Sequence, residues 1–147
     1  FGVAADVWSV TSYGELRRDA LDCERWNLLH PQEEPRVPYI TRMLNGEPVP
    51  VVATCDSMKA VPDQVARWVP GGLYSLGTDG FGRSEARAEL RDYFEVDRKY
   101  VTLAALRSLV GKGSLPAEVL SQTVRTLGID AEKPNPLTPP RPEPAAG

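Results

Sequence analysis

The chain alternates short apolar runs with longer amphipathic stretches. Residues 3–10 and 50–55 are nearly continuous apolar runs of strand length, and residues 73–76 form a third, shorter run. Apolar runs without polar alternation are typical of parallel strands that are covered on both faces. The pattern therefore predicts three buried strands, each followed by helical sequence.

The helical stretches carry their own start and stop signals. Ser12 and Glu15 have the spacing of a capping box, and His30 precedes a proline, which predicts a helix between them. Ser84 and Asp97 are the expected N-caps of two later helices. Further helices are predicted at residues 39–44, 61–69, 85–94, 98–110 and 116–127.

Strands that alternate with helices define the expected fold class. Right-handed crossovers place helices on both faces of a parallel sheet. We therefore expect an α/β three-layer sandwich with a mostly parallel sheet, formed by residues 1–130. Residues 131–147 are rich in proline, which cannot donate ladder hydrogen bonds, and are expected to be a disordered tail. Because glycine often follows a helix end, Gly2 suggests that a helix precedes residue 1 and that the chain is a fragment.

Composition narrows the classes of partner. The formal net charge is −3 and the pI is about 5.2, with basic residues scattered among acids, so we expect no nucleic-acid partner. No apolar run approaches the ~20 residues that span a bilayer, and no signal-peptide pattern opens the chain, so we expect a cytoplasmic protein without membrane contact. Cys23 and Cys55 lack metal-ligand spacing and are expected to be reduced, buried thiols, with no metal site.

A glycine-rich turn after the third predicted strand is the candidate site. In open α/β sheets, ligands bind at the carboxyl ends of the strands. Backbone N–H groups at a glycine turn that opens a helix can hold an anion. The turn matches neither GxGxxG nor a Walker loop, and short glycine turns are common, so the favoured interpretation is that Gly80 and Gly82 only shape the connection. The residues of this possible ligand or subunit-contact turn are Asp79, Gly80, Phe81, Gly82 and Ser84.

Other titratable groups give weaker signals. His30 is the only histidine, so a Ser-His-Asp arrangement would need it, but its place before Pro31 suits capping or packing. Asp19, Asp22 and Glu24 crowd one helix, where a solvated charged face is the favoured interpretation over acid and base chemistry. We therefore expect no catalytic residue and no cofactor-binding residue in this chain.

Several strings of the sequence resemble one enzyme family. The turn at residues 79–84 resembles the D-x-F-G-x-S turn in the C-terminal domain of transketolase-like, thiamine-diphosphate enzymes. Further strings resemble, in the same order, the homodimeric bacterial pyruvate dehydrogenase component. They are residues 5–12, 15–19, 23–27, 29–31, 36–39 and 77–84, and the resemblance extends over about residues 3–130.

The resemblance implies a function for a longer protein. In that family the enzyme, an oxidoreductase and a homodimer, decarboxylates pyruvate on thiamine diphosphate with magnesium. It then reductively acetylates a lipoyl group of the dihydrolipoyl acetyltransferase. The family's pyrophosphate motif, activating glutamate and active-site histidines lie in other domains. The nearest string here, residues 78–80, lacks the first glycine and the later asparagine of that motif.

The resemblance thus implies a transketolase C-terminal-like fold that lacks its first strand and helix. It implies a structural, subunit-contact segment that binds no cofactor and is inactive alone. The missing strand would leave an exposed sheet edge. One alternative is a free-standing α/β binding or assembly module with an anion site at residues 79–84. Another is a segment of a related transketolase or another 2-oxoacid dehydrogenase.

Overall fold

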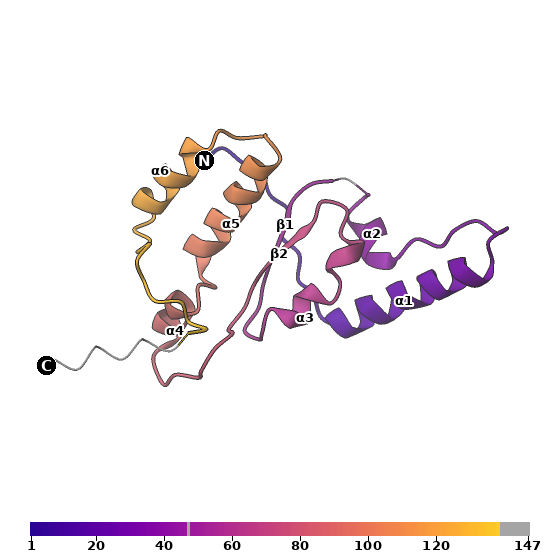
Figure 1. The fold of residues 1–147 in the computed structure, drawn as a ribbon, viewed down its shortest axis with the longest axis horizontal. Helices are drawn as coiled ribbons and strands as arrows, with labels where there is room; N and C mark the ends of the chain where they lie inside the picture. Colours follow the sequence, from indigo (N-terminus) through magenta and orange to yellow (C-terminus); the bar gives the residue numbers. More distant parts are fainter. Residues whose placement is uncertain (47, 139–147) are drawn as a thin grey trace, which may run out of the picture.

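The computed structural model describes residues 1–46 and 48–138 and has a mixed α/β fold. At its centre, β1 (Val51–Thr54) and β2 (Leu73–Leu76) pair in parallel, as Figure 1 shows. Within the described residues the sheet consists of these two strands. Both strands lie where the apolar runs predicted them, so their positions and the mixed α/β class are confirmed. The predicted burial is not, because only Ala53 and Leu76 are buried and the other strand residues are half-buried or exposed.

The crossover between the strands is broken into two short pieces. The single helix predicted at residues 61–69 is wrong, because α3 (Ala60–Asp63) ends early and a 3₁₀ turn, η1 (Ala66–Trp68), follows. Val65 lies between them at φ −110° and ψ 0°, outside helical geometry, and is fully buried. The inward positions of Val65 and Val69 are confirmed.

The predicted first helix is confirmed as α1 (Tyr13–Leu29). The Ser12 hydroxyl accepts from the Glu15 backbone N–H at 3.1 Å, which supplies the cap that the sequence predicts. Ala20 and Cys23 are buried on its inner face. The remaining side chains of α1 are exposed or half-buried, so the helix is held along one stripe.

The short helix predicted at residues 39–44 is confirmed as α2 (Tyr39–Met43), which packs against α1. Its first backbone N–H donates to the Asp19 carboxylate on α1 at 2.6 Å. Asn45 and Gly46 follow it at φ 55° and 65°, a left-handed pair that ends the helix as predicted.

Three helices follow β2. They are α4 (Arg87–Tyr93), α5 (Arg98–Gly111) and α6 (Glu118–Thr126). Helix α5 packs on both strands, and α6 packs on α5. Figure 1 shows α5 and α6 on one side of the strand pair and α1, α2 and α3 on the other. The three-layer sandwich with a larger parallel sheet stays a prediction.

The core lies where β2 meets α5. Leu76, Val96, Tyr100 and Ala104 form its buried cluster. Asp97 caps α5 as predicted, because its carboxylate accepts from the backbone N–H groups of two residues in the first turn, at 2.8 and 3.2 Å. The cap and the cluster fix the helix against the end of the strand.

The predicted cap at Ser84 is wrong. Helix α4 begins at Arg87, and the exposed Ser84 lies outside it. The Glu89 carboxylate accepts from the Ala86 backbone N–H at 3.2 Å and satisfies the first turn instead. The N-cap is Ala86, which has no capping side chain, so Glu89 supplies only the reciprocal half of a capping box.

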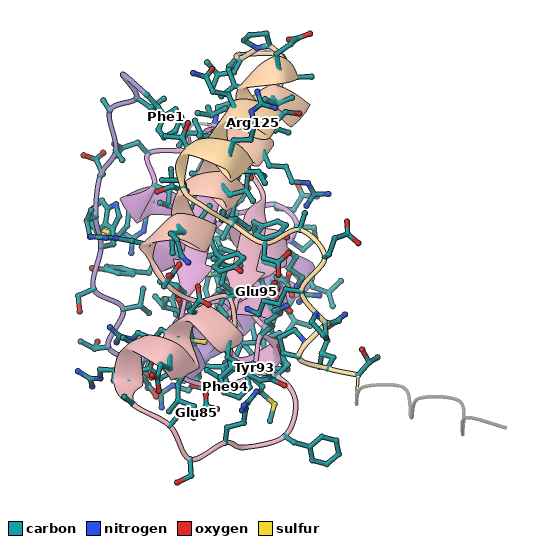
Figure 2. All side chains as sticks on the ribbon, turned by 90° about the vertical axis from the view of Figure 1, so that its left-hand side faces the viewer. Phe1, Glu85, Tyr93, Phe94, Glu95 and Arg125 are labelled. Carbon is teal, nitrogen blue, oxygen red and sulfur yellow. The ribbon has the colours of Figure 1, made fainter. Side chains whose placement is uncertain are left out.

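The buried strand predicted at residues 3–10 is also wrong. These residues form no strand in the structure, and Val7 and Trp8 are 96% and 56% exposed. Figures 1 and 2 place Phe1 beside α6, near Arg125, from where the segment runs past the strands to α1. A strand requires a hydrogen-bonded neighbour, and here β1 and β2 pair only with each other. Apolar sequence without a partner strand stays irregular.

The C-terminal segment continues past residue 130 in contact with the rest of the molecule. Lys133 contacts the end of α4, and residues 135–138 form a turn. Residues 139–147, the larger part of the predicted tail, lie outside the described residues. The domain boundary at residue 130 and the disorder of the tail stay predictions.

Candidate functional site

The candidate turn lies at the carboxyl end of β2, where the sequence places it. Its first residues are tied to the loop after β1: the Asp79 carboxylate oxygens accept from the Lys59 backbone N–H, both at 3.3 Å. The Thr78 backbone N–H donates to the Ser57 carbonyl at 2.9 Å. A Cβ at Gly77 would lie 2.5 Å from that same Ser57 oxygen, so only glycine fits there. The two strand ends are thereby held together.

Of the two glycine positions in the turn, one requires a glycine and the other has room for a side chain. Gly80 has φ +112°, and a Cβ there would lie 2.3 Å from the Pro136 carbonyl oxygen. Both its backbone conformation and its close approach to Pro136 need glycine. Gly82 has open space around the position of a Cβ. The turn therefore depends on Gly80 much more than on Gly82.

The second half of the turn projects into solvent. Phe81 is 75% exposed, and Ser84 is exposed. The Arg83 guanidinium lies 4.2 Å from the centre of the Tyr93 ring and pairs with Glu85. Because α4 begins only at Arg87, the turn does not open directly into a helix as the anion hypothesis assumed. A carboxylate already occupies the first turn of that helix.

An open recess of about 230 Å³ lies beside the turn. Lys59 and Asp79 line it from the strand ends, while Glu95 and Lys133 line it from the segments that follow α4 and α6. The Lys133 ammonium lies 3.9 Å from the Glu95 carboxylate. Figure 2 shows Glu95 beside Tyr93 and Phe94 at the end of α4. The lining is charge-balanced and gives no strong preference for an anion.

Sequence reasoning missed Lys59, Lys133 and Pro136 as neighbours of the turn. Lys59 directly follows the loop after β1, and the rule that strand ends meet could have placed it there. Lys133 and Pro136 lie in the segment that the sequence assigned to a disordered tail. Their contacts have no local signal in the sequence.

The residues at the turn do not fit thiamine diphosphate or magnesium, the groups that the resemblance implies. Magnesium takes oxygen ligands, usually carboxylates, and the Asp79 oxygens here accept from a backbone N–H. A pyrophosphate would meet two carboxylates, Asp79 and Glu95, as well as two lysines in the recess, so the lining offers no excess of positive charge to hold it. Across residues 1–46 and 48–138, His, Cys, Asp and Glu form no cluster of three or more that could hold a metal. That this segment binds neither group stays a prediction.

His30 has the packing role that its position suggests. Its Nδ1 lies 3.0 Å from the Trp26 carbonyl, and its ring stacks on the Trp26 indole with centroids 3.6 Å apart. The Arg36 guanidinium lies 3.5 Å from the centre of the same indole. The histidine closes the C-terminal end of α1.

The three acids on α1 each make a separate contact. Asp19 accepts from the first residue of α2, and the Asp22 carboxylate lies 3.7 Å from the Arg36 guanidinium. Glu24 accepts from the indole N–H of Trp68. They hold α1 to its neighbours and do not converge on a common point.

The two cysteines are free thiols. Cys23 is buried as expected, and burial raises the pKa of its thiol, with the nearby Asp19 carboxylate adding to the rise. The expectation that Cys55 is buried is wrong, because this residue is only half-buried at the end of β1. Its Sγ lies 3.2 Å from the Ser57 carbonyl.

Within the part of the chain that the structure describes, no helix is long and apolar enough to cross a membrane.

A parallel strand pair with a crossover on one side and α5 on the other defines the class of protein: a mixed α/β domain. Residues 1–97 match the family described as transketolase-like TK C-terminal domain, and the chain belongs to that family. The match covers α1 to α4 and the candidate turn. It confirms the family resemblance that the sequence motifs indicate.

Individual relatives match more of the chain. The pyruvate dehydrogenase E1 component of Pseudomonas aeruginosa is 51% identical over 138 residues, which are 93% of this chain and 16% of that protein. That of Escherichia coli K12 is 51% identical over 137 residues, 92% of the chain and 15% of the protein. That of Haemophilus influenzae is 45% identical over 138 residues, which are 93% of this chain and 15% of that protein. The chain thus spans only 15 to 16% of the length of these relatives.

Proposed function

We propose that this chain is a segment of a pyruvate dehydrogenase E1 component. The observation that carries the proposal is the 51% identity over 93% of the chain to a protein of that name. The complete protein is an oxidoreductase of the cytoplasm. It decarboxylates pyruvate with thiamine diphosphate and magnesium, and it reductively acetylates the lipoyl group of the dihydrolipoyl acetyltransferase.

Within that protein the segment has a structural role and contacts the rest of the E1 homodimer. Large apolar side chains at two places are exposed and support this role. Val7 and Trp8 are exposed in the N-terminal segment, and Leu28 and Leu29 are 79% and 54% exposed at the end of α1. In the complete protein, further strands extend the sheet into a three-layer sandwich and cover the residues 3–10.

The catalytic machinery belongs to other parts of the protein. The charge-balanced recess and the poor fit of Asp79 to a metal support this division. Thiamine diphosphate and magnesium are therefore held outside this segment, and the chain alone has no activity.

A comparison of the 147-residue chain with the complete E1 protein that contains it tests the proposal. We expect pyruvate decarboxylation and calorimetric binding of thiamine diphosphate with magnesium in the complete protein, and neither in the chain. Circular dichroism of the chain serves as the control that it is folded. Tight coenzyme binding by the folded chain would contradict the division of roles. A complete protein that binds the coenzyme but does not act on pyruvate would contradict the proposed enzyme.

A further inference from the structure

Residues 133–138 cross the candidate turn at its most constrained point. A Cβ at Gly80 would lie 2.3 Å from the Pro136 carbonyl oxygen and 3.1 Å from its carbon. Asp79 of the turn and Asn135, Pro136 and Leu137 of the later segment all line the recess beside the turn. The two segments therefore close over a shared space, although they lie far apart in the sequence.

Lys133 anchors the segment to the core. Its ammonium donates to the Asp92 carbonyl at the end of α4 and lies 3.5 Å from the Tyr100 hydroxyl and 3.9 Å from the Glu95 carboxylate. Its side chain is only 16% exposed. A lysine with so little exposure is rare unless it is paired, and here several oxygen atoms surround the charge.

A local turn fixes the shape of the segment beyond the anchor. The Asn135 side-chain oxygen accepts from the Leu137 backbone N–H at 2.9 Å. The Asn135 carbonyl accepts from the Thr138 backbone N–H at 3.0 Å. These bonds hold the Pro136 carbonyl in the position that excludes any side chain at Gly80.

We propose that residues 133–138 form a strap that holds the candidate turn, residues 79–84, in one conformation. Asp79 ties the start of the turn to the Lys59 backbone, whereas Phe81 and Ser84 further along are exposed. Because the Pro136 carbonyl lies against Gly80, between these two parts, the strap limits how far the turn opens. Loss of the Lys133 anchor releases the turn and opens the recess. This proposal rests on contacts within the chain and is independent of the proposed enzyme.

Chymotrypsin cleavage after Phe81 measures the release, because proteolysis of a folded protein follows the population of its locally open form. In the full 147-residue chain, we expect Lys133→Met to accelerate this cleavage roughly tenfold, the size expected when one hydrogen bond to a charged group is lost. Lys112→Met is the matched control. The Lys112 ammonium also donates to a backbone carbonyl, that of Pro48, but lies at the end of α5 and not in the strap.

Two glycine variants distinguish the effect of losing the strap contact from the effect of backbone strain alone. Gly80→Ala pushes a Cβ into Pro136, whereas Gly72→Ala adds a Cβ at φ +81° in open space. We expect faster cleavage after Phe81 in Gly80→Ala but not in Gly72→Ala. Circular dichroism tests whether each variant is folded. If Lys133→Met does not fold, the comparison of Gly80→Ala with Gly72→Ala tests the proposal instead. Cleavage at the parent rate in Lys133→Met or, should that variant not fold, in Gly80→Ala would overturn the proposal. Equal acceleration in the matched control would also overturn it.

Discussion

The indole N–H of Trp68 donates to the Glu24 carboxylate at 2.8 Å and joins the crossover between the strands to the middle of α1. The residues are 44 positions apart. The other carboxylate oxygen pairs with the exposed Arg67. Since α1 buries only Ala20 and Cys23, this contact is a main tie between the helix and the crossover.

Replacing Glu24 tests the strength of this tie. We expect Glu24→Ala to lower the free energy of unfolding by about 1.5 kcal/mol, the lower end of the range for a hydrogen bond to a charged group, because Glu24 is partly exposed. Glu24→Gln keeps an acceptor oxygen and loses only the exposed ion pair with Arg67, which contributes little. Urea denaturation measures both variants. Equal losses in the two variants would mean that the ion pair, and not the indole hydrogen bond, stabilises the contact.

The Asp97 cap makes a similar prediction for α5. Its carboxylate accepts from the backbone N–H groups of Lys99 and Tyr100. Asp97→Ala leaves these groups without their protein partner, and we expect a loss of about 1 kcal/mol in the free energy of unfolding. Asp97→Asn is an equally good cap and should stay close to the parent in the same urea experiment. A large loss in the asparagine variant would show that the ion pair with Lys99 is the more important contact.

The Tyr100 phenol makes stability depend on alkaline pH. Burial, and next the nearby Glu95 carboxylate, raise the pKa of Tyr100 to about 12. The unfolded phenol ionises near pH 10, so the folded state binds its proton more tightly than the unfolded state. This stabilisation is fully present below pH 10 and is lost as the pH rises to about 12.

We therefore expect the free energy of unfolding to fall less steeply between pH 10 and about 12 in Tyr100→Phe than in the parent chain. Urea denaturation across that window measures the difference. A spectroscopic titration of the phenolates should also lose its last-titrating tyrosine in the variant. Parallel stability curves would show that the phenol has the same affinity for its proton in both states.

The elements that the sequence predicts correctly depend on neighbours in the chain. Ser12 and Asp97 bond to backbone groups within three residues, so their spacing alone identifies the helix starts. Both paired strands are short apolar runs between turn residues. Their signal is local, and β1 and β2 supply each other's hydrogen bonds.

The predictions that fail depend on distant or competing groups. Residues 3–10 have strand composition, but strand formation depends on a partner that sequence composition does not reveal. Ser84 is a good cap in isolation, yet the helix begins further on, with Ala86 as its N-cap and a Glu89 carboxylate that accepts from the Ala86 backbone N–H. For the candidate site, the place of the turn follows from its position after β2, whereas the close approach of Gly80 to Pro136 depends on tertiary packing alone.

Two valines separate what this chain buries by itself from what the proposed longer protein would bury. Val65 is fully buried between α3 and η1, and Val7 is 96% exposed in the segment predicted as a strand. In the 147-residue chain, we expect Val65→Ala to lower the free energy of unfolding by about 2 kcal/mol, from lost burial and the cavity left behind. Val7→Ala should change it by less than about 0.5 kcal/mol. In the complete E1 protein we expect Val7→Ala to become clearly destabilising in thermal denaturation, because the further strands that we propose would cover residues 3–10. If the Val7 variant stays neutral there, the N-terminal segment is a surface of the complete protein and the extended sheet is wrong.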